Sequence, residues 1–192
     1  MSCPPASAWI LARRYPARVL VLGLLALAPA CSSPPTSSNS QVVQARPEER
    51  EKSDRLVQRG ARFLADGLQD EAAKVLEEAR RLNPASVPAG LALARAYRLQ
   101  SRFTASRNIL EEILDAPTTE EADRSRARES LVEVLLEAGD LSSAEKALQP
   151  LLQEKKPSAT TRRLAGVVAY RNGNLTASIS ELREAIRLAP ED

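Results

Sequence analysis

The sequence predicts an all-α fold built from repeated pairs of antiparallel helices. Residues that favour helices (Leu, Ala, Glu and Arg) dominate the chain after Asp54. Small and apolar residues recur there every three or four positions, which is the period of an α-helix. One pattern returns four times along the chain, a small residue followed four positions later by an apolar one, and it starts at Ala72, Ser106, Ala144 and Ser178.

The composition suits closely packed helices and argues against binding of nucleic acid. Aromatic residues make up only 3% of the 192 residues, so the core must be built from Ala, Leu, Val and Ile. The chain has 27 basic and 25 acidic residues, and three of the basic ones (Arg13, Arg14 and Arg18) lie in a segment that we expect to be removed. The remainder is nearly neutral, and we therefore predict no nucleic-acid partner.

The first 30 residues have the order of a secretory signal peptide. The three arginines precede residues 19–28, an apolar run of about ten residues, which is short for a bilayer span. The alternative is a membrane anchor that stays in place. We predict a signal peptide over residues 1–30.

The small residues Ala28, Pro29 and Ala30 lead to Cys31, and no apolar run follows. This segment resembles a bacterial lipoprotein signal peptide, in which an aliphatic residue and two small residues precede the modified cysteine. The resemblance implies that Cys31 becomes the N-terminus and carries a thioether-linked diacylglycerol and an amide-linked acyl chain such as palmitate. Several acyl chains anchor a protein stably to a membrane.

The residue after the cysteine, Ser32, implies by the same resemblance the outer membrane of a Gram-negative-type bacterium, with the chain facing the periplasm. Residues 31–52 are predicted to form a disordered tether, because the Ser- and Pro-rich part cannot bury apolar surface and the charged part from Pro47 extends it. Such a tether reaches on the order of 25 Å on average. It would hold the helical part near the membrane surface.

The repeats themselves begin after the tether. The small residues that start the pattern are separated by 34, 38 and 34 positions, so we place an insertion of four residues near residues 117–120. We expect four helix pairs, at about 53–86, 87–120, 125–158 and 159–192.

This spacing resembles the tetratricopeptide repeat (TPR), a 34-residue pair of antiparallel helices. The first repeat matches the motif at Gly60, Phe63, Gly67, Ala72, Leu76, Ala79 and Pro84, and the fourth matches at Gly166, Gly173, Ala185 and Pro190. The second repeat departs from it, with Ser101 at the turn and Ser106 at the small position. A helical repeat of another period is the alternative. The resemblance implies an α-solenoid in which neighbouring repeats share one core.

The same resemblance implies that the first helices of successive repeats line a concave groove for an extended or helical peptide. The corresponding positions in this chain are Leu64, Arg95, Arg98, Glu133, Leu136, Glu137, Arg163, Val167 and Tyr170. Each of them could instead belong to an ordinary solvated helix face. The Lys and Asn clamp of TPR domains that bind chaperone C-termini is absent, because Val57 and Ala61 stand at those positions.

The last repeat is expected to leave apolar surface at Leu182, Ile186 and Leu188, because we expect no further helix after Pro190. That surface would favour docking of a partner or self-association. The alternative is that neighbouring charged residues shield it.

Catalysis is not expected. The chain contains no His, and its cysteines (Cys3 and Cys31) lie outside the repeats, so the usual zinc ligands and catalytic bases are missing. The glycines are isolated and form no phosphate-binding loop. We predict no enzyme, no cofactor and no metal site.

Two functions remain open from the sequence. The first is a membrane-anchored TPR lipoprotein that acts as an adaptor or scaffold in a cell-envelope assembly of the pilus, secretion or outer-membrane biogenesis type. Its partners would be another protein in the groove and the membrane through lipid at Cys31. The second is a structural or oligomerising envelope protein that associates through its last repeat and holds no peptide ligand.

Overall fold

The structure is a computed structural model that describes residues 45–190. The predicted signal peptide, the lipidated Cys31 and the predicted tether up to residue 44 lie outside the described residues. Between residues 45 and 190, no helix is both long enough and apolar enough to cross a membrane.

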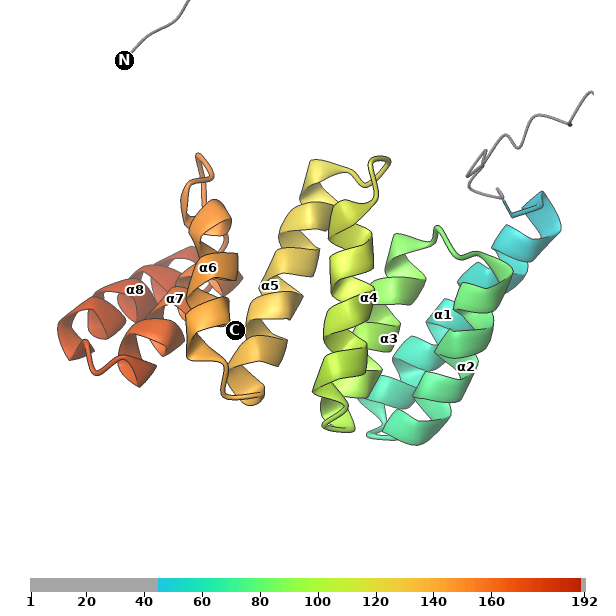
Figure 1. Ribbon diagram of the computed structural model, residues 1–192, viewed down its shortest axis with the longest axis horizontal. Coiled ribbons are helices and arrows are strands. Elements are labelled where there is room, and N and C mark those ends of the chain that lie inside the picture. The colour runs from blue at the N-terminus through green and yellow to red at the C-terminus, as the bar shows by residue number, and fades with distance from the viewer. Residues whose placement is uncertain (1–44, 191–192) are drawn as a thin grey trace, which may run out of the picture. The chain divides into compact units, whose positions relative to one another are not determined.

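The described residues form helices throughout, arranged as antiparallel pairs, which confirms the predicted fold class (Figure 1). The pairs follow one another from the cyan end of the chain to the red end, and each turn between paired helices is three residues long. The helices are α1 (Pro47–Ala65), α2 (Gln69–Leu82), α3 (Val87–Leu99), α4 (Phe103–Asp115), α5 (Glu121–Glu137), α6 (Leu141–Leu152), α7 (Ala159–Arg171) and α8 (Leu175–Leu188).

The helices stack in a fixed order. The second helices α2, α4 and α6 each pack against their own partner and against the first helix of the next pair, as α2 does against α3. The first helices α1, α3, α5 and α7 also pack against one another in succession, whereas within the described residues the second helices do not. The first helices therefore line one common side of the stack, the side on which the groove was predicted.

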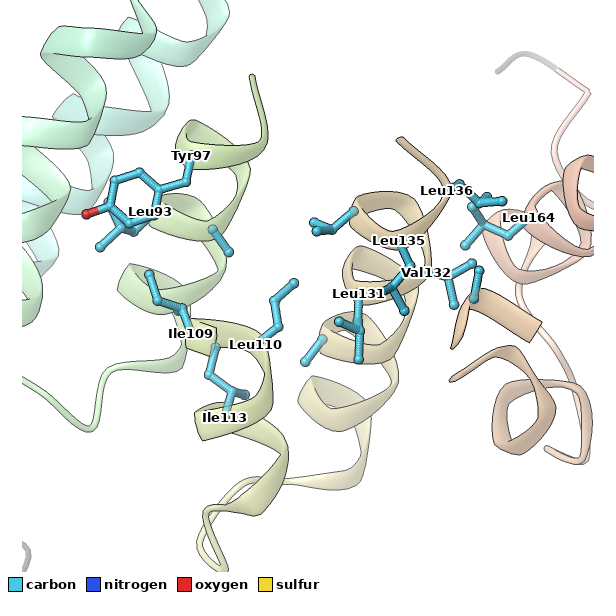
Figure 2. Close-up of a cluster of buried hydrophobic side chains, with 14 of the residues drawn as sticks. Leu93, Tyr97, Ile109, Leu110, Ile113, Leu131, Val132, Leu135, Leu136 and Leu164 are labelled. Carbon is cyan, nitrogen blue, oxygen red and sulfur yellow. The ribbon is translucent and has the colours of Figure 1, made fainter. Parts of the chain in front are cut away.

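One cluster of buried apolar residues extends from α1 to α7, and Figure 2 shows part of it. It includes Leu93 of α3, Leu110 of α4, Leu131 of α5 and Leu164 of α7, all of which are buried. No single helix pair could bury this surface alone, so each repeat is stabilised by its neighbours.

Two glycines allow the helices of a pair to approach closely. A Cβ atom placed on Gly60 of α1 would lie 2.5 Å from Cγ of Leu76 in α2, and one on Gly166 of α7 would lie 2.6 Å from Cγ of Leu182 in α8. Both separations are too short for real carbon atoms. The motif glycines at these positions therefore serve helix packing.

The first helix begins earlier than expected. Helix α1 starts at Pro47, so residues 47–52 belong to it and not to the tether. The backbone N–H of Arg46 donates a hydrogen bond to the Glu49 carboxylate over 2.9 Å, and Glu48 and Glu49 in the first turn complement the positive end of the helix dipole. The charged run that suggested a tether is a helix with a solvated surface.

The extra four residues of the third repeat lie within a helix. By register, Val87 of α3 corresponds to Ser125 of α5, yet α5 starts at Glu121. Residues 121–124 thus form an additional first turn, and the insertion lies just after the predicted segment 117–120. The guanidinium of Arg124 donates hydrogen bonds to the carbonyl oxygens of Leu114 (2.6 Å) and Ala116 (2.8 Å), which are free of helical partners at the end of α4.

Candidate functional site

The first helices of the first three repeats enclose a hollow of about 470 Å³, which we call the central hollow. Helix α1 contributes two residues, α3 five and α5 three, and α4 closes the floor. The lining residues are Ala61, Leu64, Leu91, Ala92, Ala94, Arg95, Arg98, Ser106, Leu110, Ser130, Glu133 and Val134.

Helical periodicity explains why these residues meet. On α3, Leu91, Arg95 and Arg98 are four and three positions apart, so they share one face of the helix. The floor is held by Ser106 of α4, whose buried hydroxyl donates a hydrogen bond of 2.7 Å to the carbonyl oxygen of Ala94. The central hollow is therefore a preformed feature of the packed helices.

An ion network runs along one rim of the central hollow. Arg98 of α3 pairs with Glu137 of α5, and its guanidinium lies 3.4 Å from the Glu133 carboxylate. Glu133 also pairs with Arg163 of α7 over 2.8 Å. The Arg98 side chain is only 18% exposed, so burying its charge would be unfavourable without these carboxylates. The pairs of Arg98 therefore connect α3 to α5.

Arg95 differs from Arg98 although it lies only one helical turn away. Its side chain is exposed, and it makes no hydrogen bond or ion pair with any residue that the structure describes. Its positive charge at the edge of the central hollow is therefore available to a ligand.

The structure brings together six of the nine residues that the sequence placed in the groove. Leu64, Arg95, Arg98 and Glu133 line the central hollow, and Glu137 and Arg163 join it through the ion network. The other three do not line the hollow.

Leu136 is only 8% exposed and packs into the core, where it offers a ligand little surface. Val167 is half-buried against the core, and Tyr170 is 62% exposed away from the central hollow. Residues next to a groove position on a helix turn by about 100°, so Leu136 faces the core although Glu137 and Glu133 face the groove.

Sequence reasoning missed Leu91, Ala92 and Ser130, which also line the central hollow. A usable signal was present for two of them. Leu91 lies one turn before Arg95, and Ser130 lies one turn before Glu133, so extending each helix face by a turn would have found both.

The chemistry of the site is that of binding. The central hollow offers apolar side chains from α1, α3 and α5, a rim of paired charges, and Arg95, which pairs with no residue in the described range. Within residues 45–190, no group of His, Cys, Asp or Glu side chains could hold a metal ion.

Comparison with known proteins identifies the repeats. Residues 129–192 match the model of the tetratricopeptide repeat family. This stretch covers the end of α5 with α6, α7 and α8. The sequence matches no curated protein.

Several solved structures share the fold. A structure from the functional characterisation of Pseudomonas aeruginosa pilF has a TM-score of 0.64 and 18% identity, over 76% of this chain and 64% of that one. A tetratricopeptide repeat protein from Parabacteroides merdae has a TM-score of 0.62 and 17% identity, over 74% of this chain and 54% of that one. MamA from Desulfovibrio magneticus has a TM-score of 0.55 and 18% identity, over 74% and 78%.

The chain thus spans less than two thirds of the first two of these proteins, and identities this low show the shared fold alone. The matched family is a non-catalytic scaffold fold whose domains bind other proteins. Residues 129–192 therefore belong to the tetratricopeptide repeat family by sequence, and the eight paired helices of the described residues have the tetratricopeptide-like fold.

Proposed function

We propose that this chain is a lipid-anchored adaptor of the bacterial cell envelope that holds a segment of another protein in its groove. The observation that carries the proposal is the central hollow, which has apolar residues from α1, α3 and α5 in its lining. At its edge lies the charge of Arg95, which pairs with no residue that the structure describes. The central hollow lies on the side lined by the first helices, where an extended or helical segment can run across several repeats.

The hollow indicates what the bound segment must present. Leu64, Leu91 and Ala92 favour an apolar side chain as the anchor. Arg95 favours a carboxylate beside that anchor, because a charge-assisted hydrogen bond to an exposed arginine adds affinity and fixes register. Arg98 adds little, since Glu133 and Glu137 already neutralise it.

The envelope setting rests on the N-terminal sequence. Residues 1–30 have the order of a lipoprotein signal peptide, and Cys31 stands where the modified cysteine belongs. An anchored adaptor of this kind suits assembly of a pilus, a secretion complex or outer-membrane proteins. The likeness to the pilF structure supports the shared fold and does not select among these three settings.

Site-specific photo-crosslinking in cells tests the groove. A photoreactive residue in place of Leu91 should trap a partner protein, and the same residue in place of Lys74, which is exposed on α2, should not. Adding Arg95→Glu should weaken the Leu91 crosslink about tenfold while the helical content in circular dichroism stays unchanged. Equal crosslinking from both positions, or no effect of Arg95→Glu, would contradict the proposal.

Arg98 should not be reversed in the same variant. A glutamate at position 98 would stand beside Glu133 and Glu137 and place three carboxylates together. Like charges at such distances destabilise a fold, so a loss of binding in that variant would report on stability.

The anchor is tested by intact mass and membrane fractionation of the wild-type protein beside Cys31→Ala. The proposal expects a mature species that begins at Cys31, is heavier by acyl groups, and leaves the membrane fraction in the variant. An unmodified chain that still carries Arg13 would contradict the lipid anchor and leave the groove proposal standing.

The alternative function, a structural role in which copies associate through the last repeat, has one observation in its favour. Ile186 is 64% exposed on α8, and Leu175, Ile179 and Leu188 are exposed on the same helix. Arginines around this surface disfavour a second copy as its occupant.

A further inference from the structure

The last repeat carries a face that the other repeats keep covered. In the first three repeats, the side of the second helix that points onward is covered by the next first helix, as α6 is by α7. Helix α8 packs only against α7 among the described helices. A hollow of about 260 Å³ remains on its open side, lined mainly by Ala159, Thr160, Arg163, Leu182, Ala185 and Ile186, and we call this surface the α8 face.

Equivalent residues show that the α8 face is suited to a helix. Leu110 and Leu148 occupy the position of Leu182 in the second and third repeats and are buried there by the following helix. Leu182 is only half-buried, and Ile186 is 64% exposed. The α8 face thus keeps the apolar residues that hold a helix elsewhere in the chain.

We propose that the α8 face binds an amphipathic helix of a partner protein, one with small apolar residues on one side and carboxylates at both ends of that side. The bound helix would pack against α8 as α7 packs against α6. This site shares no lining residue with the central hollow and touches it only through the pair of Arg163 with Glu133, so it does not depend on the groove proposal.

Charge selects the carboxylate at the start of the bound helix. In the third repeat, Glu129 of α5 accepts hydrogen bonds from the hydroxyls of Ser158 and Thr161 at the start of α7, the latter over 2.8 Å. The fourth repeat has Arg163 at the position of Glu129. The Arg163 guanidinium already pairs with Glu133 over 2.8 Å, but its side chain is 51% exposed and has further N–H donors. A carboxylate on the incoming helix is therefore favoured where α7 carries a hydroxyl, and a cation is disfavoured there.

A second substitution selects the carboxylate near the other end. In the first repeat, Glu77 of α2 accepts a hydrogen bond of 2.7 Å from the hydroxyl of Tyr97 on α3. The fourth repeat has Arg183 at the position of Glu77. Arg183 is exposed and, unlike Arg163, makes no ion pair or hydrogen bond with any residue in the described range, so a carboxylate of the bound helix can pair with it.

The same charges disfavour a second copy of this chain. The onward-stacking partner would be α1 of another copy, whose outward side consists of the exposed residues Arg55, Arg59 and Arg62. In the register of the repeats, that arrangement would bring Arg55, at the position of Thr161, against Arg163, and Phe63, at the position of Ala169, against Arg183. The first contact joins like charges, and the second leaves Arg183 without an acceptor. A two-fold pairing of α8 with α8 would likewise bring arginines of the two copies together.

A peptide probe tests the proposal. The probe is residues 157–172 of this chain with Thr161→Glu and Ala169→Glu, because positions 161 and 169 are those that would meet Arg163 and Arg183. The control peptide carries Thr161→Lys and Ala169→Lys. Titrated by fluorescence anisotropy onto the full-length chain, the acidic peptide should bind at least tenfold more tightly than the basic one.

Variants of the full-length chain locate the binding. Ile186→Glu should weaken the acidic peptide at least tenfold without loss of helicity, since the side chain is exposed. Arg183→Glu should reduce or reverse the difference in affinity between the acidic and the basic peptide. Arg59→Glu, which makes a similar charge change at the other end of the stack, and Arg95→Glu in the central hollow should both leave the affinity unchanged.

Three results would overturn the inference. Equal affinities for the two peptides would remove the charge argument, and binding that survives Ile186→Glu would place the peptide elsewhere. Dimers of the chain alone in sedimentation velocity that Ile186→Glu abolishes would assign the α8 face to a second copy. If the photoreactive residue at position 91 traps no partner while the acidic peptide still binds, only the groove proposal is contradicted.

Discussion

The two ends of the stack use equivalent positions in opposite ways. On α3, the side that faces the preceding repeat is formed by Ala89, Leu93 and Ala96, all buried. The equivalent residues of α1, which has no preceding repeat among the described residues, are the exposed arginines Arg55, Arg59 and Arg62. At the far end, α8 keeps its apolar residues although no described helix covers them.

This comparison teaches that a position in the repeat does not by itself decide burial. In α1, arginines stand where α3 has apolar residues, and their charged ends remain solvated when no helix packs against them. The last end keeps apolar residues such as Ile186, which is consistent with a surface that is covered when bound. The difference between the ends can be measured with matched substitutions in the first and last repeats.

The largest difference is expected between Leu76→Ala and Leu182→Ala. Both leucines occupy the same repeat position, but Leu76 is fully buried, whereas Leu182 is half-buried at the α8 face. We expect Leu76→Ala to lower the free energy of unfolding by about 3 kcal/mol and Leu182→Ala by about 1 kcal/mol. Urea unfolding followed by circular dichroism measures both, and equal losses would show that α8 is covered in the free protein.

A smaller difference is expected between Gly60→Ala and Gly166→Ala. The new Cβ would press on Leu76 at one site and on Leu182 at the other, at nearly the same distance. Leu76 cannot move, so Gly60→Ala should destabilise the fold by about 2 kcal/mol. Leu182 can move into the hollow of the α8 face, but the new Cβ would also lie 3.3 Å from the carbonyl oxygen of Ser178. Gly166→Ala should therefore cost about 1 kcal/mol, less than Gly60→Ala.

Urea unfolding also measures the free energies of unfolding of Gly60→Ala and Gly166→Ala. Gly67→Ala serves as a control for the effect of backbone conformation. Gly67 has a φ of 74°, and a Cβ there would meet no atom within 4 Å, so its cost reports backbone strain alone. A Gly166→Ala variant as unstable as Gly60→Ala would contradict the mobility of Leu182.

The smallest difference concerns two ion pairs that the ends share. Arg81 donates hydrogen bonds to Glu78 on α2, and Arg187 does so to Glu184 at the equivalent place on α8. Each arginine lowers the pKa of its glutamate below the ordinary value, chiefly through this hydrogen bond. Because these pairs lie within one helix, we expect the two ends to behave alike.

The sign of their pH dependence follows from the lowered pKa. Each pair adds to stability above the pKa of the unfolded chain, and this contribution is lost as the pH falls through the lower pKa of the folded chain. Carboxyl NMR titrations should show both midpoints below 4.5 and both rising in Arg81→Ala and Arg187→Ala. A shift at only one end would indicate that the ends differ even within a single helix.

The sequence alone determined the repeat, the helix pairs and the small residues at their crossings. These features depend on spacing within a few tens of residues. The three- and four-residue period predicted that Gly60, Leu76 and their equivalents lie where paired helices meet. The same spacing placed Leu64, Arg95 and Glu133 on the first helices, and all three line the central hollow.

The tertiary structure decided what depends on contacts between repeats. The start of α1 at Pro47 and the added turn at 121–124 are stabilised by hydrogen bonds that no periodic pattern reports, such as those of Arg124 to the end of α4. The tertiary structure also decides that Arg98 is paired with carboxylates whereas Arg95 is not. Glu133 and Glu137, 35 and 39 positions further along the chain, reach one arginine and not the other, because side chains that adjoin on one helix face different neighbours in the stack.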